Sequence, residues 1–350
     1  MRMFKNDYSE GAAPEVLAAL VATNAEQAPG YTEGDAHCER ARALIREACG
    51  RDDVAVEFCV GGTSANVIGV TGLLRDWEGV ICTPDAHIVV HETGAVAACG
   101  RTVLPTDDAD GFLTPEAAER VWASQTSCGR HMTRPGAIYL SDTTELAGVW
   151  DLARFDAICD WADARGLKVF LDGARLGSAL TSPLAGGLTL GHIAQRCAAF
   201  YIGGTKNGLL LGEAMVISDP GLREAFPYLV KERGGLLAKG RVLGAQFEAV
   251  FEPADGGGEA PYWRLARQAN EAAERLGAGM VALGFEPYGQ PGSNQRFFVV
   301  PADVAQRFVD AAGCEVFYTL ADGRKVVRLV CSWATTAADV DELLTWAAAL

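Results

Sequence analysis

The chain has 350 residues, 49% of them apolar and 21% charged, and its formal net charge is −15. This length and composition fit one large globular domain with a smaller one beside it, and they provide enough apolar residues for a sizeable core. The negative charge repels phosphate backbones and anionic lipid headgroups, which argues against nucleic acid and membranes as partners.

The cysteines and the N-terminus indicate the compartment. The ten cysteines are scattered from Cys38 to Cys331, without a CxxC pair or a Cys/His cluster at metal-ligand spacing. Such cysteines are usually small buried residues. The segment after Met1 is polar rather than a signal peptide, and no apolar run is long enough to cross a bilayer. We therefore expect a cytoplasmic protein without a metal site.

Helices and strands alternate up to residue 202. The predicted helices are 36–49, 64–75, 88–99, 114–124 and 152–165, and the predicted strands are 54–60, 79–82, 102–105, 137–141, 167–171 and 198–202. This alternation favours an α/β fold with a mostly parallel sheet covered on both faces. In such sheets ligands bind beyond the carboxyl ends of the strands.

The pattern changes after about residue 220. Residues 221–249 predict a long helix broken near Gly234 and Gly235, and the segment 253–261 is rich in Gly, Glu and Pro. A helix at 262–283, strands near 296–300 and 326–331 and a closing helix at 336–349 follow. We therefore divide the chain into an N-terminal arm with a first helix (1–24), a large domain (25–250) and a smaller α+β C-terminal domain (251–350).

Residues suited to chemistry follow the predicted strands. They are Gly61, Gly62 and Thr63 after 54–60, His87 after 79–82, Asp142 to Glu145 after 137–141, Asp172 with Arg175 after 167–171, and Lys206 after 198–202. Glycines before a helix suit a phosphate, because the helix N-terminus offers free N–H groups. The spacings of a Walker loop and of the GxGxxG dinucleotide motif are absent.

Each of these residues also has a plain structural explanation. The glycines can form a tight turn, Asp172 can cap a helix, and Lys206 can be a surface lysine before an Asn-Gly turn. Together they meet the needs of pyridoxal 5′-phosphate (PLP). A lysine in a crevice can form a Schiff base, an aspartate can pair with a protonated pyridine nitrogen, and an imidazole such as that of His87 can stack on the ring.

Eight segments carry a resemblance to a known family. They are FKNDYSEGA (4–12), GYTEGD (30–35), GGTSAN (61–66), HIVVHETGA (87–95), TTELAGVW (143–150), DGARLGSAL (172–180), GGTKNG (203–208) and RLVCSWATT (328–336). In these segments the chain resembles the low-specificity L-threonine aldolases, which belong to the aldolase/β-eliminating lyase branch of fold type I PLP enzymes. The resemblance implies a PLP-binding large domain and a smaller C-terminal domain.

The resemblance also implies roles at the cofactor. The matching positions are Lys206 for the Schiff base, Asp172 for the pyridine nitrogen, His87 for stacking on the ring, Gly62 and Thr63 for the phosphate, and Arg175 for the cofactor or the substrate carboxylate. A basic residue of the neighbouring subunit often reaches the phosphate, and Lys239 and Arg241 are the two candidates. A homodimer or homotetramer with shared active sites is therefore expected.

The substrate is implied to lie among a second set of residues. Arg328 and Arg175 match arginines that hold the substrate carboxylate, and His131 matches a histidine that approaches the β-hydroxyl. Asn6 stands where many members have a serine, and Tyr31 is expected near the β-carbon. The implied reaction is retro-aldol cleavage of L-threonine, L-allo-threonine and related β-hydroxy-α-amino acids, catalysed by a PLP-dependent aldehyde-lyase.

Two alternatives stay open at this point. The first is β-elimination, racemisation or transamination of another amino acid on the same scaffold. Of these, β-elimination would release pyruvate and ammonia. A PLP-fold protein without catalysis that serves as a binding or scaffolding subunit is the second alternative. The presence of both Lys206 and Asp172 argues against it, because a non-catalytic protein has no chemical need of either.

Overall fold

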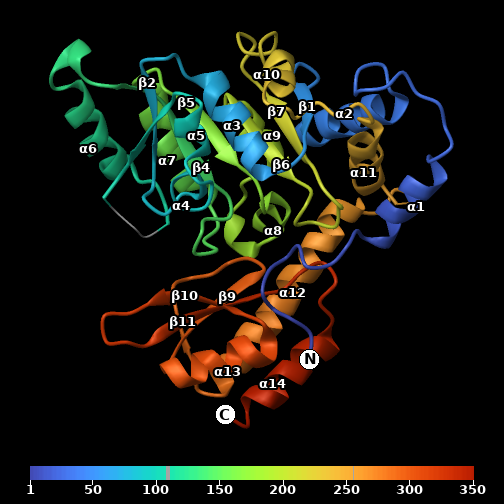
Figure 1. Ribbon diagram of the computed structural model, residues 1–350, viewed down its shortest axis with the longest axis vertical. Helices are drawn as coiled ribbons and strands as arrows, with labels where there is room; N and C mark the ends of the chain where they lie inside the picture. Colours follow the sequence, from blue (N-terminus) through green and yellow to red (C-terminus); the bar gives the residue numbers. More distant parts are fainter. Residues whose placement is uncertain (108–110, 255) are drawn as a thin grey trace.

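The computed structural model describes residues 1–107, 111–254 and 256–350. Within these residues two sheets form the frame of the molecule, a large one in the upper part of Figure 1 and a small one below it. The large sheet has the strand order β1-β7-β6-β5-β4-β2-β3. Its strands are β1 (Ala55–Cys59), β2 (Glu78–Cys82), β3 (Thr102–Pro105), β4 (Arg134–Ser141), β5 (Lys168–Asp172), β6 (Ala199–Gly203) and β7 (Glu213–Ile217).

The large sheet is mostly parallel. Strands β3, β2, β4, β5 and β6 run in one direction, whereas β7 is antiparallel to both β6 and β1. The predicted α/β fold is therefore confirmed, and the strands predicted up to residue 202 all form. Strand β7 was not predicted, because an apolar run of five residues cannot be told from a turn or a helix segment by its period.

Helices cover both faces of this sheet (Figure 1). Successive residues of β5 point to opposite faces, so Val169 and Leu171 enter one apolar core and Phe170 enters the other. The helices of this part are α1 (Pro14–Ala22), α2 (Ala36–Cys49), α3 (Gly62–Leu73), α4 (His87–Val90), α5 (Ala95–Ala98), α6 (Pro115–Thr126), α7 (Leu152–Asp163), α8 (Leu176–Leu180), α9 (Leu190–Arg196), α10 (Phe226–Glu232) and α11 (Arg241–Phe251), with 3₁₀ turns at Gly129–His131 and Pro183–Ala185.

Two of the predicted helical segments are interrupted in the structure. The continuous helix 88–99 is wrong, because Thr93 and Gly94 have φ of 52° and 72° and place a turn between α4 and α5. A positive φ cannot continue a right-handed helix. The break in 221–249 is confirmed and is wider than predicted, since α10 ends at Glu232 and α11 begins at Arg241.

The small sheet is antiparallel, with the order β10-β11-β9-β8. Its strands are β8 (Glu286–Pro287), β9 (Gln295–Val300), β10 (Glu315–Thr319) and β11 (Lys325–Val330), and its helices are α12 (Pro261–Ala282), α13 (Ala302–Ala312) and α14 (Ala337–Ala347). One face of this sheet joins an apolar core with the helices, and the other face packs against Ala147 of the large part. Strands β8 and β10 and helix α13 were not predicted.

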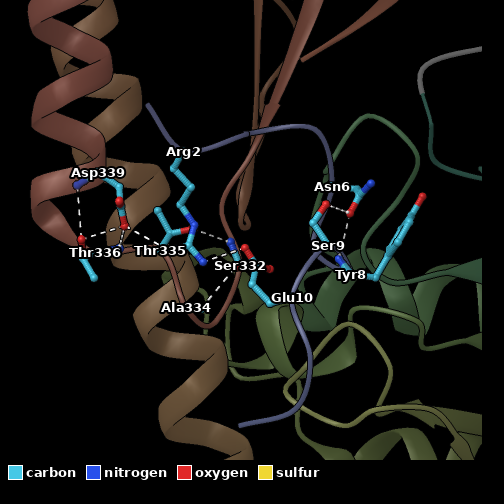
Figure 2. A network of polar contacts seen from close by, with 10 residues as sticks. All are labelled: Arg2, Asn6, Tyr8, Ser9, Glu10, Ser332, Ala334, Thr335, Thr336 and Asp339. Carbon is cyan, nitrogen blue, oxygen red and sulfur yellow. Dashed lines mark hydrogen bonds and ion pairs between the residues drawn. The ribbon is translucent and has the colours of Figure 1, made fainter. Parts of the chain in front are cut away.

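The N-terminal arm joins the two parts. The Phe4 N–H donates to the Ala312 carbonyl at 2.7 Å and the Phe4 carbonyl accepts from the Val330 N–H at 2.9 Å, while the Phe4 ring is fully buried. Arg2 pairs with Asp339 at 3.2 Å and with Glu10 at 2.6 Å (Figure 2). The arm is thus tied to the small part before it reaches α1. The division at residues 24 and 250 stays a prediction.

Several general features bear on the compartment and on metals. All ten cysteines are free, and all except Cys99 and Cys128 are buried. Over residues 1–107, 111–254 and 256–350, no helix is long and apolar enough to cross a membrane. Across the same ranges, no cluster of His, Cys, Asp and Glu side chains is arranged to hold a metal ion.

Candidate active site

Three strand ends of the large sheet meet at the candidate site. Strands β4 and β5 pair as far as Ser141 and Asp172. The Asp142 N–H donates to the Asp172 carbonyl at 2.9 Å, and the Gly203 N–H donates to the Gly173 carbonyl at 3.0 Å. These bonds bring Asp172 beside the loop that follows β6 and carries Lys206. The expectation that chemistry would gather at the carboxyl ends of the parallel strands agrees with this arrangement.

Asp172 is a buried carboxylate surrounded by donors. Its Oδ2 accepts from the Tyr139 hydroxyl at 2.5 Å and from Asn66 Nδ2 at 2.9 Å. Its Oδ1 accepts from the Tyr201 hydroxyl at 2.5 Å and from the Ala174 N–H at 3.0 Å. Burial acts to raise the pKa of the Asp172 carboxyl, but the charge of His87 and these hydrogen bonds outweigh it and hold that pKa below its usual value.

Lys206 stands in a loop that a second carboxylate fixes. Glu213 on β7 accepts from the Gly204 N–H and from the Thr205 hydroxyl, both at 2.9 Å. Burial and the positive charge of Arg175 lower the pKa of the Lys206 ammonium, against the opposing charges of nearby carboxylates. A lysine with a lowered pKa is available as the neutral amine that Schiff-base formation needs.

His87 connects to Asp172 through two side chains. Its Nδ1 lies 2.7 Å from Oε1 of the buried Glu92, and that same oxygen accepts from Asn66 Nδ2 at 2.8 Å. Burial acts to lower the pKa of His87, but Glu92 and the charge of Asp172 prevail and raise it. The Glu92 carboxylate therefore fixes the imidazole through Nδ1, and the His91 ring lies 5.4 Å from the His87 ring, centre to centre.

The turn before α3 is suited to a phosphate. α3 begins at Gly62 and leaves the N–H groups of its first turn without helical partners. The buried Ser64 hydroxyl has no hydrogen-bond partner among the described residues. A Cβ at Gly62 would lie 3.3 Å from the Tyr201 hydroxyl, a tight contact that the glycine avoids. This turn, Asp172 and Lys206 fit the phosphate, the pyridine nitrogen and the aldehyde carbon of PLP.

Arg175 is held by Asp7 of the N-terminal arm. The Arg175 Nε and Nη2 donate to the two Asp7 oxygens at 2.7 and 3.0 Å, and Asn294 Nδ2 donates to Asp7 at 2.9 Å. Burial acts to raise the pKa of Asp7, but Arg175 and Lys206 lower it to about 2. The Nη1 group of Arg175 is left free of described partners, so it can take a substrate carboxylate while Asp7 fixes the other edge.

Asn6, which was predicted to contact the substrate, precedes Asp7 in the chain but makes its hydrogen bonds elsewhere. Its side-chain oxygen accepts from the Tyr8 N–H at 3.0 Å and from the Ser9 hydroxyl at 2.8 Å (Figure 2). These bonds form a turn that directs Asp7 inward. The sequence placed the substrate role on Asn6, whereas the buried contact to Arg175 belongs to the next residue.

Arg328 lies across from the site on the small sheet. It pairs across strands with Phe297, on the face that packs against Ala147 of the large part. Its guanidinium pairs with Glu315 and lies 5.2 Å from the centre of the Phe317 ring. Arg328 therefore faces the large part, with its Nη2 paired to Glu315 and its Nη1 donating to Gln295 Oε1 at 3.4 Å.

Two predicted residues lie away from Lys206. His131 is exposed in the 3₁₀ turn before β4, at the opposite end of that strand from Ser141. The eight residues of β4 span about 25 Å at 3.3 Å each. Tyr31, half exposed with φ of 56°, lines a cavity of about 750 Å³ together with Lys239 and Arg241.

Sequence reasoning missed several residues of the site. They are Asp7, Asn66, Glu92, Tyr139, Tyr201 and Glu145. Glu145 was noted after its strand without a role, yet its charge acts to raise the pKa of His87, of Arg175 and of Lys206, so it lies near all three. A usable signal existed for Asn66 in the GGTSAN segment, but the tyrosines sit inside strands and are typical of core residues.

Comparisons with known proteins agree with this arrangement. The low specificity L-threonine aldolase of Pseudomonas sp. (strain NCIMB 10558) is 28% identical over 346 residues, which cover 98% of this chain and 96% of the relative. The structure of the threonine aldolase of Leishmania major superposes with a TM-score of 0.94 at 36% identity, over 99% of this chain and 98% of that one.

Cystalysin from Treponema denticola, whose structure contains a PLP cofactor, has the same fold. It superposes with a TM-score of 0.73 at 13% identity, over 100% of this chain and 90% of that chain. The fold type I architecture and the resemblance to the low-specificity L-threonine aldolases are thereby confirmed. The family model of the beta-eliminating lyases matches residues 6–302, which include every strand of the large sheet and the loop that carries Lys206. The chain therefore belongs to the beta-eliminating lyase family.

Proposed function

We propose that the protein cleaves L-threonine, L-allo-threonine and related β-hydroxy-α-amino acids to glycine and an aldehyde. Membership of the beta-eliminating lyase family makes it a PLP-dependent lyase. The observation that carries the specific reaction is the similarity to threonine aldolases over nearly the whole chain, 98% of it for the Pseudomonas enzyme and 99% for the Leishmania enzyme.

When bound, PLP supplies an electron sink for the carbanion that cleavage of the Cα–Cβ bond leaves behind. Lys206 is the amine that attaches the cofactor, and Asp172 holds the proton on its pyridine nitrogen. His87 covers the ring, while the turn at Gly62 and Thr63 takes the phosphate. These roles agree with the hydrogen bonds of Asp172 and with the lowered pKa of Lys206.

Arg175 and Arg328 orient the substrate carboxylate from opposite sides of the site. Arg175 already has one edge fixed by Asp7, and its free Nη1 suits a carboxylate. Arg328 faces the large part but pairs with Glu315, so it serves only if the substrate carboxylate replaces that partner. Asn6 acts through the turn that places Asp7, and Tyr31 acts only from a neighbouring subunit.

The β-hydroxyl proton needs a base. His131 is the candidate from the family pattern, and its place at the far end of β4 requires that it serve the site of another subunit. Glu145 is a carboxylate of the same chain near Lys206 and His87. If His131→Asn lowers kcat and Glu145→Gln does not, the base is His131, and the opposite result assigns Glu145.

We also propose a homodimer or homotetramer with shared sites that acts in the cytoplasm. The free cysteines support a reducing compartment. Of the two basic candidates for a neighbouring phosphate, Arg241 donates to the carbonyls of Thr23 and Glu26 at 2.9 and 2.5 Å. The exposed Lys239 ammonium has no partner among the described residues, which favours Lys239.

The test is an absorbance spectrum of the purified protein, followed by addition of L-threonine and an assay for acetaldehyde and glycine. A visible band that is lost in Lys206→Ala, with acetaldehyde released by the wild type, supports the proposal. A band without acetaldehyde but with pyruvate and ammonia from other amino acids would assign β-elimination instead, and a change of enantiomer would assign racemisation. No band after PLP is supplied would refute the role of Lys206.

A further inference from the structure

Two tyrosines approach Asp172 from neighbouring strands. Tyr139 on β4 is the register partner of Phe170 on β5, and Tyr201 lies on β6. The ring centres of Tyr139 and Phe170 are 5.9 Å apart, and those of Phe170 and Tyr201 are 6.4 Å apart. Asp172 is two residues beyond Phe170 and so lies on the same face of the sheet. The aromatic row therefore carries both phenol groups to the carboxylate.

The phenols and their neighbours saturate this carboxylate. A carboxylate offers about four lone-pair positions. Each Asp172 oxygen accepts one phenol, at 2.5 Å in both cases, and one N–H donor, from Asn66 at 2.9 Å and from Ala174 at 3.0 Å. A pyridine N–H must share this shell, so one existing donor has to yield.

The phenols are the donors that can yield. Asn66 is fixed because it also donates to Glu92 at 2.8 Å, and the Ala174 donor is a backbone N–H. Each phenol donates to Asp172 through a single hydroxyl, so its bond can lengthen when a further donor arrives. Tyr139 and Tyr201 are both almost fully buried and are therefore held in place by packing.

We propose that Tyr139 and Tyr201 are positioning residues that hold Asp172 in its ionised form and aim both of its oxygens, and thereby keep the pyridine nitrogen of the cofactor protonated. Within the pair formed by Asp172 and the pyridine nitrogen, one proton is shared. A donor on Asp172 stabilises the carboxylate and so favours the proton on nitrogen, while loss of that donor favours the neutral acid and neutral pyridine. The inference rests on the proposed function for the identity of the cofactor.

The size of the effect follows from the bonds lost. A hydrogen bond to a charged group changes an equilibrium by roughly ten- to a hundredfold. In Tyr139→Phe and Tyr201→Phe, the ratio of the form with the proton on the pyridine nitrogen to the form with the proton on Asp172 should therefore fall by roughly ten- to a hundredfold at a fixed pH. The tyrosine that yields to the cofactor should show the smaller fall.

The direct measurement is nitrogen NMR of the holoenzyme loaded with PLP labelled with ¹⁵N in the ring, recorded at one pH, because the ¹⁵N chemical shift distinguishes a protonated from a neutral pyridine nitrogen. Tyr262→Phe is the matched control, because Tyr262 is also fully buried and its hydroxyl donates to the Gly203 carbonyl at 3.0 Å rather than to Asp172. A ¹⁵N chemical shift displaced toward that of neutral pyridine in at least one of the two variants, with the control unchanged, supports the proposal. Values equal to the wild type in both variants would overturn it.

A second substitution covers the case in which a phenylalanine variant does not fold. 3-Fluorotyrosine at position 139 or 201 keeps the packing and makes the phenol a stronger donor, so the ¹⁵N chemical shift should move toward that of protonated pyridine. A move toward neutral pyridine, or no change in either position together with unchanged phenylalanine variants, would contradict the proposal. Wild-type protein that takes up no labelled PLP would instead refute the proposed function, which separates the two failures.

Discussion

The ion pair between Asp7 and Arg175 ties the N-terminal arm to the active site, and its loss should cost much of the stability of the fold. Asp7 is 1% exposed and has three hydrogen bonds, two from Arg175 and one from Asn294. The replacement Asp7→Asn keeps the shape but removes the charge. It leaves the Arg175 guanidinium without its counter-charge beside Lys206.

The magnitude can be worked out from the pKa of Asp7. Lowering that pKa from 3.8 to about 2 corresponds to about 2.5 kcal/mol of unfolding free energy, at about 1.36 kcal/mol per pKa unit. Since the folded-state pKa is depressed, this stability is present above pH 4 and is lost as the pH falls toward 2. Removing one partner of a buried pair typically costs about 3–5 kcal/mol. We therefore expect Asp7→Asn to lose about 2–5 kcal/mol at pH 7.

Urea unfolding at pH 7 and at pH 3 measures this loss. The variant should unfold at a lower urea concentration at pH 7, and its disadvantage should shrink at pH 3, where part of the wild-type Asp7 is protonated. Lys5→Gln is the control, because Lys5 is an exposed residue of the same arm. Equal urea midpoints for Asp7→Asn and the wild type at pH 7 would show that the ion pair does not stabilise the fold.

Two further predictions concern buried positions near the site. Burial raises the pKa of Glu213 from 4.5 to about 7, so the wild type should lose about 2.5 kcal/mol of stability as the pH rises from 5 to 8. Glu213→Gln should lack this dependence in urea unfolding, and a parallel pH dependence in both proteins would contradict the prediction. In Gly69→Ala the new Cβ would lie 2.1 Å from the Phe170 ring. Because overpacking costs about 1–3 kcal/mol, the Tm should fall by several degrees. An unchanged Tm would show that the ring can move.

The sequence predicted the central residues of the site because they lie directly after strands. Lys206, Asp172 and Arg175 each come directly after an apolar strand, and the topology of a parallel sheet brings such positions together. It did not separate Asn6 from Asp7, since both are polar residues of the same arm and only the turn made by Asn6 shows which side chain points inward.

The tyrosines and the histidine show the two limits of that reasoning. Tyr139 and Tyr201 alternate with apolar strand residues, so their period predicts core packing and gives no sign that their hydroxyl groups reach a carboxylate. For His131, a match to the family pattern gives the position in the chain but not the distance between its imidazole and Lys206. The length of β4 places it at the other end of the sheet.

The charges around Lys206 explain why one lysine can serve as a nucleophile among three buried carboxylates. Asp7 is ionised, with a pKa of about 2, but Arg175 neutralises it. Asp172 is ionised and is surrounded by donors, and its charge is directed at the pyridine nitrogen. Glu213 has a pKa raised to about 7 by burial, so it carries only part of a charge at neutral pH. Glu145 adds a further charge that acts to raise the pKa of Lys206, but burial and Arg175 prevail, and that pKa falls below its usual value.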